Sequence, residues 1–148
     1  MAVSEGAARR LDFLSVLSYC FLVRAFKYTG FNRFAKKEGI TDAELLEVVS
    51  HLEDDQADAN LGGDVYKVRF ARPGEGKAGG YRVIVYFRNE FRTFFVYGFP
   101  KADRDNIDEK ELRAFKADAK EDFSLTDDQI AAWLKRGTLI EVPVKPEG

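Results

Sequence analysis

The chain has 148 residues and 45% apolar side chains, the size and composition of one folded domain with a substantial core. Its single cysteine, Cys20, excludes an internal disulfide and a cysteine-based metal cluster. Its single histidine, His51, excludes metal sites built from two or three histidines. The formal net charge of −2 is, taken alone, an argument against a nucleic-acid-binding protein.

The charge is distributed unevenly along the chain. Residues 64–104 hold nine Lys or Arg and four Asp or Glu, a net +5, so the rest of the chain carries −7. The nine cations are Lys67, Arg69, Arg72, Lys77, Arg82, Arg88, Arg92, Lys101 and Arg104. A local positive field of this kind guides a polyanion to one face of a protein. The structural alternative is a solvated strand surface.

Residues 1–21 are predicted to be an extension that precedes the domain at 22–142, and residues 143–148 a tail. Two arginines precede the apolar run Leu11–Val23 and make it similar to a signal peptide, but Asp12 interrupts that run and no A-x-A-like cleavage site follows. The run is also shorter than the ~20 residues that span a bilayer. Three alternatives stay open: a segment packed on the domain, a segment packed on a partner, and an artefact of an early start codon.

The first elements predicted in the domain are one strand and two helices. Residues 22–28 have strand character, and Phe31–Glu38 fits a short helix that Gly39 closes. A capping box of Thr41 and Glu44 opens the second helix. The apolar stripe of that helix is Leu45, Val48, Val49 and Leu52. His51 lies off the stripe, so we expect it to be exposed rather than catalytic.

Three strand-like runs follow a predicted loop at Glu53–Asn60; they are Val65–Ala71, Arg82–Arg88 and Thr93–Phe99. A segment rich in glycine and proline, residues 73–80, separates the first two runs, and Asn89-Glu90 marks a tight hairpin before the third. Connections this short favour an antiparallel meander, because parallel neighbours need long crossovers.

Two helices and a short strand are predicted at the C-terminal end. Asn106 and Asp108 open the first helix, Thr126 caps the second, and Gly137 ends it. Thr138–Val142 then adds a last short strand. The predicted fold class is α+β, a small antiparallel sheet with helices packed on one face and C-terminal helices.

The candidate catalytic residues are three cations, Lys67, Arg69 and Arg82. Period-2 alternation places Lys67 and Arg69 on one face of their strand, and Arg82 on the adjacent strand can reach the same face. Converging cations repel one another, and a phosphate relieves this repulsion because guanidinium groups bind it with two hydrogen bonds. No metal and no cofactor is expected at this site. The alternative is that each cation extends into water.

The glycine-rich segment 73–80 fits no nucleotide-binding motif. Three of its glycines have the spacing of the dinucleotide fingerprint, but a strand rather than a helix follows them. The P-loop pattern also fails, because Ala78 stands where Ser or Thr would bind magnesium. A glycine-rich loop that carries Lys77 can still let a nucleic-acid backbone approach closely.

Further side chains near the basic block are candidates for RNA contacts. Tyr97 carries an aromatic ring that could stack on a base, and two cations follow it in the sequence. The complete candidate RNA-binding set is Arg72, Lys77, Tyr81, Tyr97, Lys101 and Arg104.

The chain resembles the RelE/HigB-type toxins of bacterial toxin–antitoxin pairs, in the RelE/ParE superfamily. The segments that carry the resemblance are Phe31–Ile40, Val65–Arg69, Gly76–Ile84, Phe95–Lys101 and Asp105–Ile107. The resemblance covers roughly residues 22–142 and is specific over 65–107. It implies a small antiparallel sheet with a concave basic face that cleaves messenger RNA in the ribosomal decoding site.

The resemblance also implies a chemistry for the three cations, which fall on the family's catalytic positions. In that chemistry the ribose 2′-hydroxyl attacks its own phosphate without a metal ion. Lys67 would assist proton removal if neighbouring cations lower its basicity, and Arg69 and Arg82 would stabilise the charge of the transition state.

One position departs from the family. Several members place a tyrosine or histidine after the third strand, whereas Ile107 and Asp108 stand near that point here. The general base is therefore left open between Tyr97, Tyr81 and Lys67 acting alone.

The resemblance further implies a cytoplasmic protein whose partners are mRNA on the ribosome and a cognate antitoxin, expected to be a small helix-turn-helix protein. No membrane association is expected. Two alternatives stay open. One is a non-enzymatic or degenerate toxin of the same fold that binds another target, such as DNA gyrase. The other is a regulatory module whose basic face binds only an acidic partner segment.

Overall fold

The computed structural model describes residues 24–72, 76–89, 91–102, 104 and 106–143, with only the backbone for 72 and 76–79. The predicted extension and all of the predicted tail except Pro143 lie outside these residues. The described strands are β2 (Arg24–Tyr28), β3 (Ala59–Gly62), β4 (Val65–Arg72), β5 (Gly76–Arg88), β6 (Arg92–Pro100) and β7 (Leu139–Val142). The described helices are α2 (Thr29–Glu38), α3 (Asp42–Glu53), α4 (Glu109–Phe123) and α5 (Asp127–Arg136).

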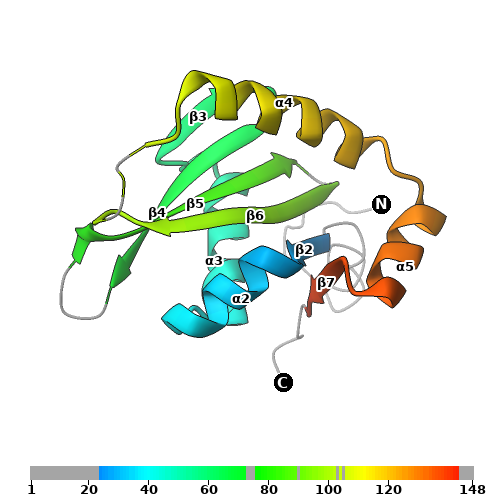
Figure 1. Cartoon of the computed structure of the whole chain (residues 1–148), viewed down its shortest axis with the longest axis horizontal. Coiled ribbons are helices and arrows are strands. Elements are labelled where there is room, and N and C mark those ends of the chain that lie inside the picture. The colour runs from blue at the N-terminus through cyan, green and yellow to red at the C-terminus, as the bar shows by residue number, and fades with distance from the viewer. Residues whose placement is uncertain (1–23, 73–75, 90, 103, 105, 144–148) are drawn as a thin grey trace, which may run out of the picture.

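The six strands form one sheet in the order β3-β4-β5-β6-β2-β7 (Figure 1). The predicted meander is confirmed, since β4 pairs antiparallel with β5 and β5 with β6. One pairing differs from the expected antiparallel pattern, because β2 runs parallel to β6. The helices α2 and α3 and three strands lie between β2 and β6 in the sequence, which provides the long crossover that a parallel pair requires.

Two segments predicted as loops contain strand residues. The polar segment that ends at Asn60 enters β3, whose residues pair with the edge of β4. Strand β5 begins at Gly76, inside the glycine-rich segment. Both loop predictions were wrong for the same reason. Strand pairing is made by backbone hydrogen bonds, so an edge strand or a glycine-rich strand needs no alternating apolar pattern.

Helices cover both faces of the sheet. Helices α2 and α3 pack on one face, and α4 lies across the other with α5 beside it (Figure 1). The largest fully buried side chains of the first core are Phe31, Leu45, Val83, Val85 and Phe95. Those of the second core are Phe26, Val65, Ile84, Tyr86, Phe94, Ile130 and Leu139. The α+β class is confirmed, and α4 adds a second helical layer that the expected one-sided packing did not include.

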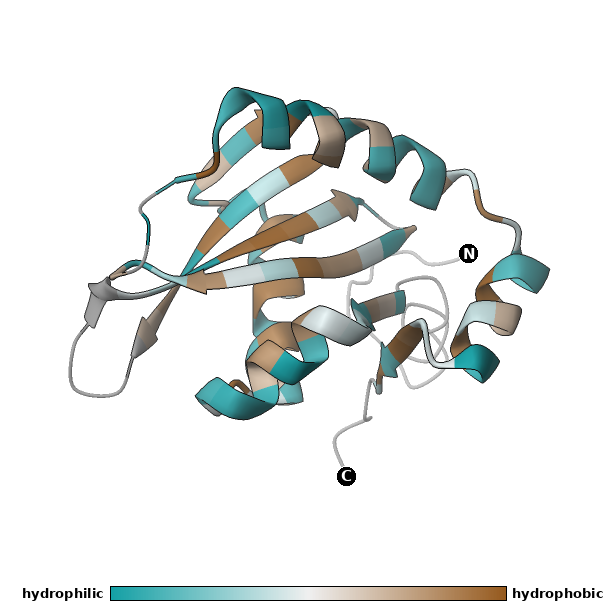
Figure 2. Ribbon diagram, in the orientation of Figure 1, coloured by the Kyte–Doolittle hydropathy of each residue, from teal (hydrophilic) through white to brown (hydrophobic). Residues whose placement is uncertain are grey.

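Short polar motifs fix where the helices begin and end. Thr41, Asp108 and Thr126 each form a complete capping box with the residue three positions later, as the sequence indicates for α3 and α5. Gly39 and Gly137 end α2 and α5 in the left-handed conformation, with φ of +78° and +89°. The hydropathy colours in Figure 2 show the result, with polar residues on the outer surface of α4 and apolar residues along the central strands.

Candidate active site

The three candidate catalytic cations lie on the sheet face that α4 partly covers. The residues before and after them in the strands pack into the core beneath α2 and α3; they are Val68, Phe70, Tyr81 and Val83. Strand alternation therefore turns Lys67, Arg69 and Arg82 to the opposite face, as predicted for Lys67 and Arg69.

The backbone register brings these cations close together. Arg69 and Arg82 are directly opposite each other in the β4–β5 ladder, so their Cα atoms are about 5 Å apart. Lys67 follows on the same face two residues along β4, at roughly 7 Å. Arg69 is exposed, Lys67 is half-buried and Arg82 is only 4% exposed. The cluster therefore extends from the surface into the sheet.

The ammonium group of Lys67 is held by a neutral acceptor. Lys67 Nζ donates a hydrogen bond of 3.0 Å to the side-chain Oδ1 of Asn106, in the segment between β6 and α4. An amide oxygen orients the ammonium without adding a negative charge beside it. This contact connects the segment before α4 to the candidate catalytic cations.

Arg104, a predicted RNA contact, already binds a carboxylate of the chain. Both of its terminal nitrogens donate to the carboxylate of Glu111, and its Nε donates to the backbone oxygen of Asn106 at 3.1 Å. The hydrogen bond to Glu111 raises the pKa of Arg104, and the same contact lowers the pKa of Glu111. The guanidinium also lies 5.3 Å from the ring centre of Phe99. Arg104 is therefore placed to fix the segment that carries Asn106.

The two candidate tyrosines lie on opposite faces. The ring of Tyr97 is 36% exposed and lies 5.6 Å from the Phe99 ring, beside the cations. Tyr81 is 4% exposed, its hydroxyl donates to Glu38 at 2.9 Å, and its ring packs against α2. The structure therefore brings Tyr97, but not Tyr81, to the cationic face.

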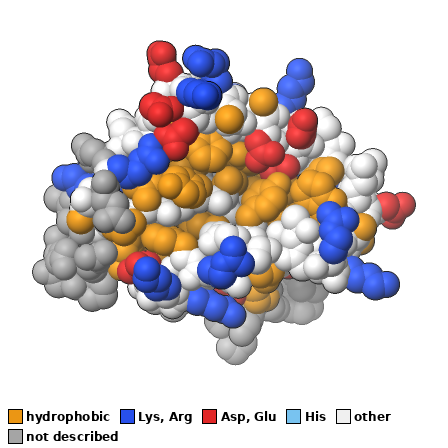
Figure 3. Space-filling view, viewed as in Figure 1, with side chains coloured by type: hydrophobic (Ala, Val, Ile, Leu, Met, Phe, Trp, Pro, Cys, Tyr) orange, Lys and Arg blue, Asp and Glu red, His pale blue; other side chains and the backbone are white. Residues whose placement is uncertain are grey.

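The remaining RNA-binding candidates lie near the same end of the sheet. Lys101 follows β6 and is half-buried, with its backbone N–H bonded to the oxygen of Gly80 at 2.9 Å. The side chains of Arg72 and Lys77 lie outside the described residues. In the space-filling view, hydrophobic side chains gather between α4 and α2, with charged side chains of both signs around the border (Figure 3).

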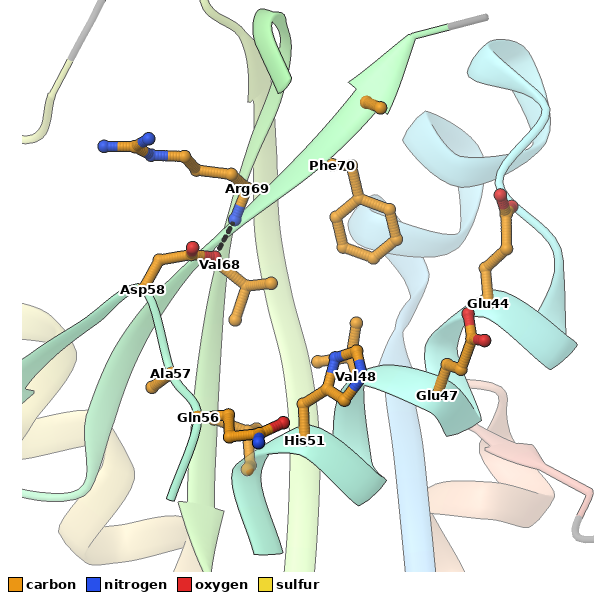
Figure 4. Close-up of a pocket in the computed structure, with 12 residues that line it drawn as sticks. Glu44, Glu47, Val48, His51, Gln56, Ala57, Asp58, Val68, Arg69 and Phe70 are labelled. Carbon is orange, nitrogen blue, oxygen red and sulfur yellow. Dashed lines mark hydrogen bonds between the residues drawn. The ribbon is translucent and has the colours of Figure 1, made fainter. Parts of the chain in front are cut away.

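A cavity of about 210 Å³ lies on the other face of the sheet, between α3 and β4 (Figure 4). Glu44, Glu47, His51 and Asp58 contribute polar side chains to it, and Asp58 accepts a hydrogen bond of 2.7 Å from the backbone N–H of Arg69. The Arg69 side chain points away from this cavity (Figure 4). Three carboxylates repel a phosphodiester, so this is not the anion-binding face. His51 is exposed, as expected.

Two further observations bear on the class of protein. In the part of the chain that the structure describes, no group of three or more His, Cys, Asp or Glu side chains is arranged to hold a metal ion. No helix among the described residues has the length and apolar character needed to cross a bilayer.

Comparison with known families shows which family the chain matches. The family described as the RelE toxin of the RelE / RelB toxin-antitoxin system matches residues 23–142. The chain belongs to the RelE toxin family. Membership implies a cognate antitoxin as a partner. No curated protein and no solved structure matches the chain.

The contact of Asn106 with Lys67 was not predicted from the sequence of this RelE-family chain. An asparagine just before a helix resembles a capping residue, and Asp108 is the residue that actually caps α4. Asn106 lies close to the point where several members have a tyrosine or histidine. The absence of such a residue at Ile107 and Asp108 was the available signal that another polar group occupies this place.

Proposed function

We propose that the chain is a ribosome-dependent endoribonuclease, the toxin of a toxin–antitoxin pair, which stops translation by cutting mRNA. It acts in the cytoplasm, where translating ribosomes present the substrate. The observation that carries the proposal is the cluster of Lys67, Arg69 and Arg82 on one sheet face of a RelE-family chain. A phosphodiester is the ligand that best relieves the repulsion within such a cluster.

The proposed reaction is an internal transfer within the RNA. The ribose 2′-oxygen attacks the adjacent phosphorus, the bond from phosphorus to the 5′-oxygen of the next nucleotide breaks, and a 2′,3′-cyclic phosphate forms. The proton of the 2′-hydroxyl leaves to a base, and a second proton reaches the departing 5′-oxygen. Lys67 assists proton movement, and Arg69 and Arg82 stabilise the extra negative charge on the phosphoryl oxygens.

The surrounding residues suggest how the RNA is positioned. The exposed ring of Tyr97 offers a stacking surface for a base next to the cleaved bond. Lys101 lies after the same strand and is placed to contact the backbone. Arg72 and Lys77 belong to the same proposal from their sequence positions. Tyr81 is left out because its hydroxyl and ring are used on the other face.

The test combines growth with direct mapping of RNA ends. The wild-type chain, expressed without its antitoxin, is expected to stop growth and translation, and Lys67→Met is expected to restore both. Purified protein added to ribosomes programmed with a defined mRNA should give new 5′ ends, and Lys67→Met should reduce the rate at least ~100-fold. The matched control is Lys135→Met, on the exposed end of α5, which should cut like the wild type.

Two results would overturn this function. If soluble wild-type protein leaves growth normal and gives no new RNA ends, the endoribonuclease assignment is wrong. If growth stops without RNA cuts and gyrase supercoiling activity is lost instead, the chain is a toxin with another target. The antitoxin is proposed to be a small helix-turn-helix protein, and a chain of this kind that co-purifies and blocks cutting would support the pairing.

A further inference from the structure

A hydrogen bond between Lys67 and Asn106 connects the segment before α4 to the candidate catalytic cations. The ammonium of Lys67 donates to the amide oxygen of Asn106 over 3.0 Å. Asn106 itself is exposed. An exposed asparagine usually samples several rotamers, so a fixed position for its amide requires that the backbone beneath it be held.

The chain holds that backbone from two sides. Arg104 Nε donates to the backbone oxygen of Asn106 at 3.1 Å, while the same guanidinium binds the carboxylate of Glu111. Glu111 also accepts the backbone N–H of Asp108 at 2.9 Å, and Asp108 Oδ1 accepts the N–H of Glu111 at 2.8 Å. Asn106 therefore lies between a guanidinium clamp and the cap of a 15-residue helix.

The neutrality of Asn106 is as important as its position. Among the described residues, Arg69 and Arg82 share the sheet face of Lys67, and Arg104, which lies beside Tyr97, holds the backbone of its acceptor Asn106. The carboxylate of Glu111 is bound to Arg104. A carboxylate at position 106 would neutralise the ammonium and repel the phosphate.

We propose that Asn106 is a positioning residue for Lys67, held in place by the Arg104–Glu111 clamp, so that the ammonium is oriented toward the scissile phosphate without being neutralised. This inference rests on the proposed endoribonuclease function. It assigns Arg104 to the clamp rather than to direct RNA binding. It also explains how the site works without a tyrosine or histidine after β6.

The activity test uses two substitutions at one position. Asn106→Ala removes the acceptor and is expected to lower the single-turnover cleavage rate on programmed ribosomes about tenfold, with less than a twofold change in apparent affinity. Asn106→Asp keeps the shape and adds a charge. The carboxylate stabilises the protonated ammonium, so the limb of the pH–rate profile that reports Lys67 should move to higher pH. Asn89→Ala, at the exposed β5–β6 turn, is the matched control and should behave as the wild type.

A second measurement does not depend on activity. NMR of the lysine ammonium groups in the full chain follows the titration and mobility of Lys67 directly. The Lys67 signal should titrate at higher pH in Asn106→Asp and become more mobile in Asn106→Ala, while thermal unfolding stays unchanged. Glu111→Gln keeps the shape of the clamp, removes its charge and should also increase that mobility.

The outcomes separate this inference from the proposed function. If the wild type cuts RNA and Lys67→Met does not, but both Asn106 variants keep the wild-type rate, pH profile and Lys67 signal, the positioning role is wrong and the function stands. If the wild type cuts no RNA, the proposed function fails and the NMR signals alone decide whether Asn106 holds Lys67. An unchanged Lys67 signal in both variants overturns the inference in either case.

Discussion

The sheet face beneath α4 has two ends whose cationic side chains differ in burial and in hydrogen-bond partners. At the covered end, Arg92 is 5% exposed and donates to the backbone oxygens of Leu125 at 2.8 Å and Asp122 at 3.3 Å and to the Asp127 carboxylate at 3.1 Å. At the open end, Arg69 is exposed and Lys67 is held by a neutral amide. A cation of the first kind fastens helices to the sheet, whereas a cation of the second kind is suited to an anionic ligand.

The covered end also buries carboxylates against tyrosines. The hydroxyl of Tyr28 donates to Asp122 at 2.7 Å, and that of Tyr86 donates to Asp118 at 2.8 Å. Burial raises the pKa of Asp122 to about 7, although the Tyr28 hydrogen bond and the charge of Arg92 act in the opposite direction. Burial also raises the pKa of both tyrosines. Polar groups at this end therefore bind one another and stabilise the docking of α4.

The largest expected effect on stability is at Arg92. Arg92→Met removes the hydrogen bonds from a buried guanidinium to the backbone oxygens of Leu125 and Asp122 and to the Asp127 carboxylate, and should lower the free energy of unfolding by about 3 kcal/mol, measured by urea denaturation. Arg69→Met, on the same face, should change it by less than about 0.5 kcal/mol because that side chain is exposed. Equal losses for the two variants would remove the distinction between the two ends.

The sequence predicted the parts of the fold that depend on local chemistry. The capping boxes at Thr41 and Thr126 and the glycine at position 137 are short-range signals, and the structure confirms each of them. The parallel pairing of β2 with β6 depends on residues about 70 positions apart, which no local pattern encodes. The burial of Asp122, near the end of α4, is likewise a tertiary property of a residue that resembles an exposed helical aspartate.

In the candidate site, too, the sequence predicted the features that depend on local structure and not those that depend on tertiary contacts. Period-2 alternation predicted the shared face of Lys67 and Arg69, because it is a property of the strand itself. The same rule placed Tyr81 one position from Arg82, and therefore on the other face, although the sequence analysis counted it among the RNA contacts. The contact between Lys67 and Asn106 depends on how the chain returns after β6, which the residues alone do not specify.

A smaller effect on the free energy of unfolding is expected from the protonation of Asp122 at the covered end. The pKa of Asp122 in the folded chain, about 7, exceeds its ordinary value of 3.8. The folded state thus binds more protons than the unfolded state between these pH values, so the stability that this group contributes at low pH is lost as pH rises through 7. Relative to Asp122→Asn, the wild type should lose roughly 1–2 kcal/mol of unfolding free energy between about pH 5 and pH 8.

The measurement for Asp122 is a series of urea denaturations of both proteins at one ionic strength. Asparagine at this position can still accept the Tyr28 hydrogen bond, so the difference between the two curves isolates the charge. A difference that stays constant with pH would show that Asp122 ionises normally and that the covered end tolerates its charge.

At the open end, the expected effect of Arg69 is on ligand binding and its salt dependence. Arg69→Gln should weaken binding to ribosomes programmed with labelled mRNA about fivefold and reduce the slope of log affinity against log salt by about 0.7, the value for one phosphate contact on a single strand. Lys135→Gln on α5 is the control and should change neither quantity. A slope unchanged by Arg69→Gln would show that the exposed guanidinium binds no phosphate.

The smallest expected effects come from two matched helix caps, one near each end. The side chain of Thr126 accepts the Gln129 N–H at 3.1 Å at the start of α5, and that of Asp108 accepts the Glu111 N–H at 2.8 Å at the start of α4. Removing either cap with alanine should cost about 0.5–1 kcal/mol of unfolding free energy. Only Asp108→Ala should also slow RNA cutting a few-fold, because it loosens the segment that positions Asn106. Suppose that the two variants lose stability equally and both cut at the wild-type rate. The α4 cap then contributes only to stability, and the position of Asn106 does not depend on it.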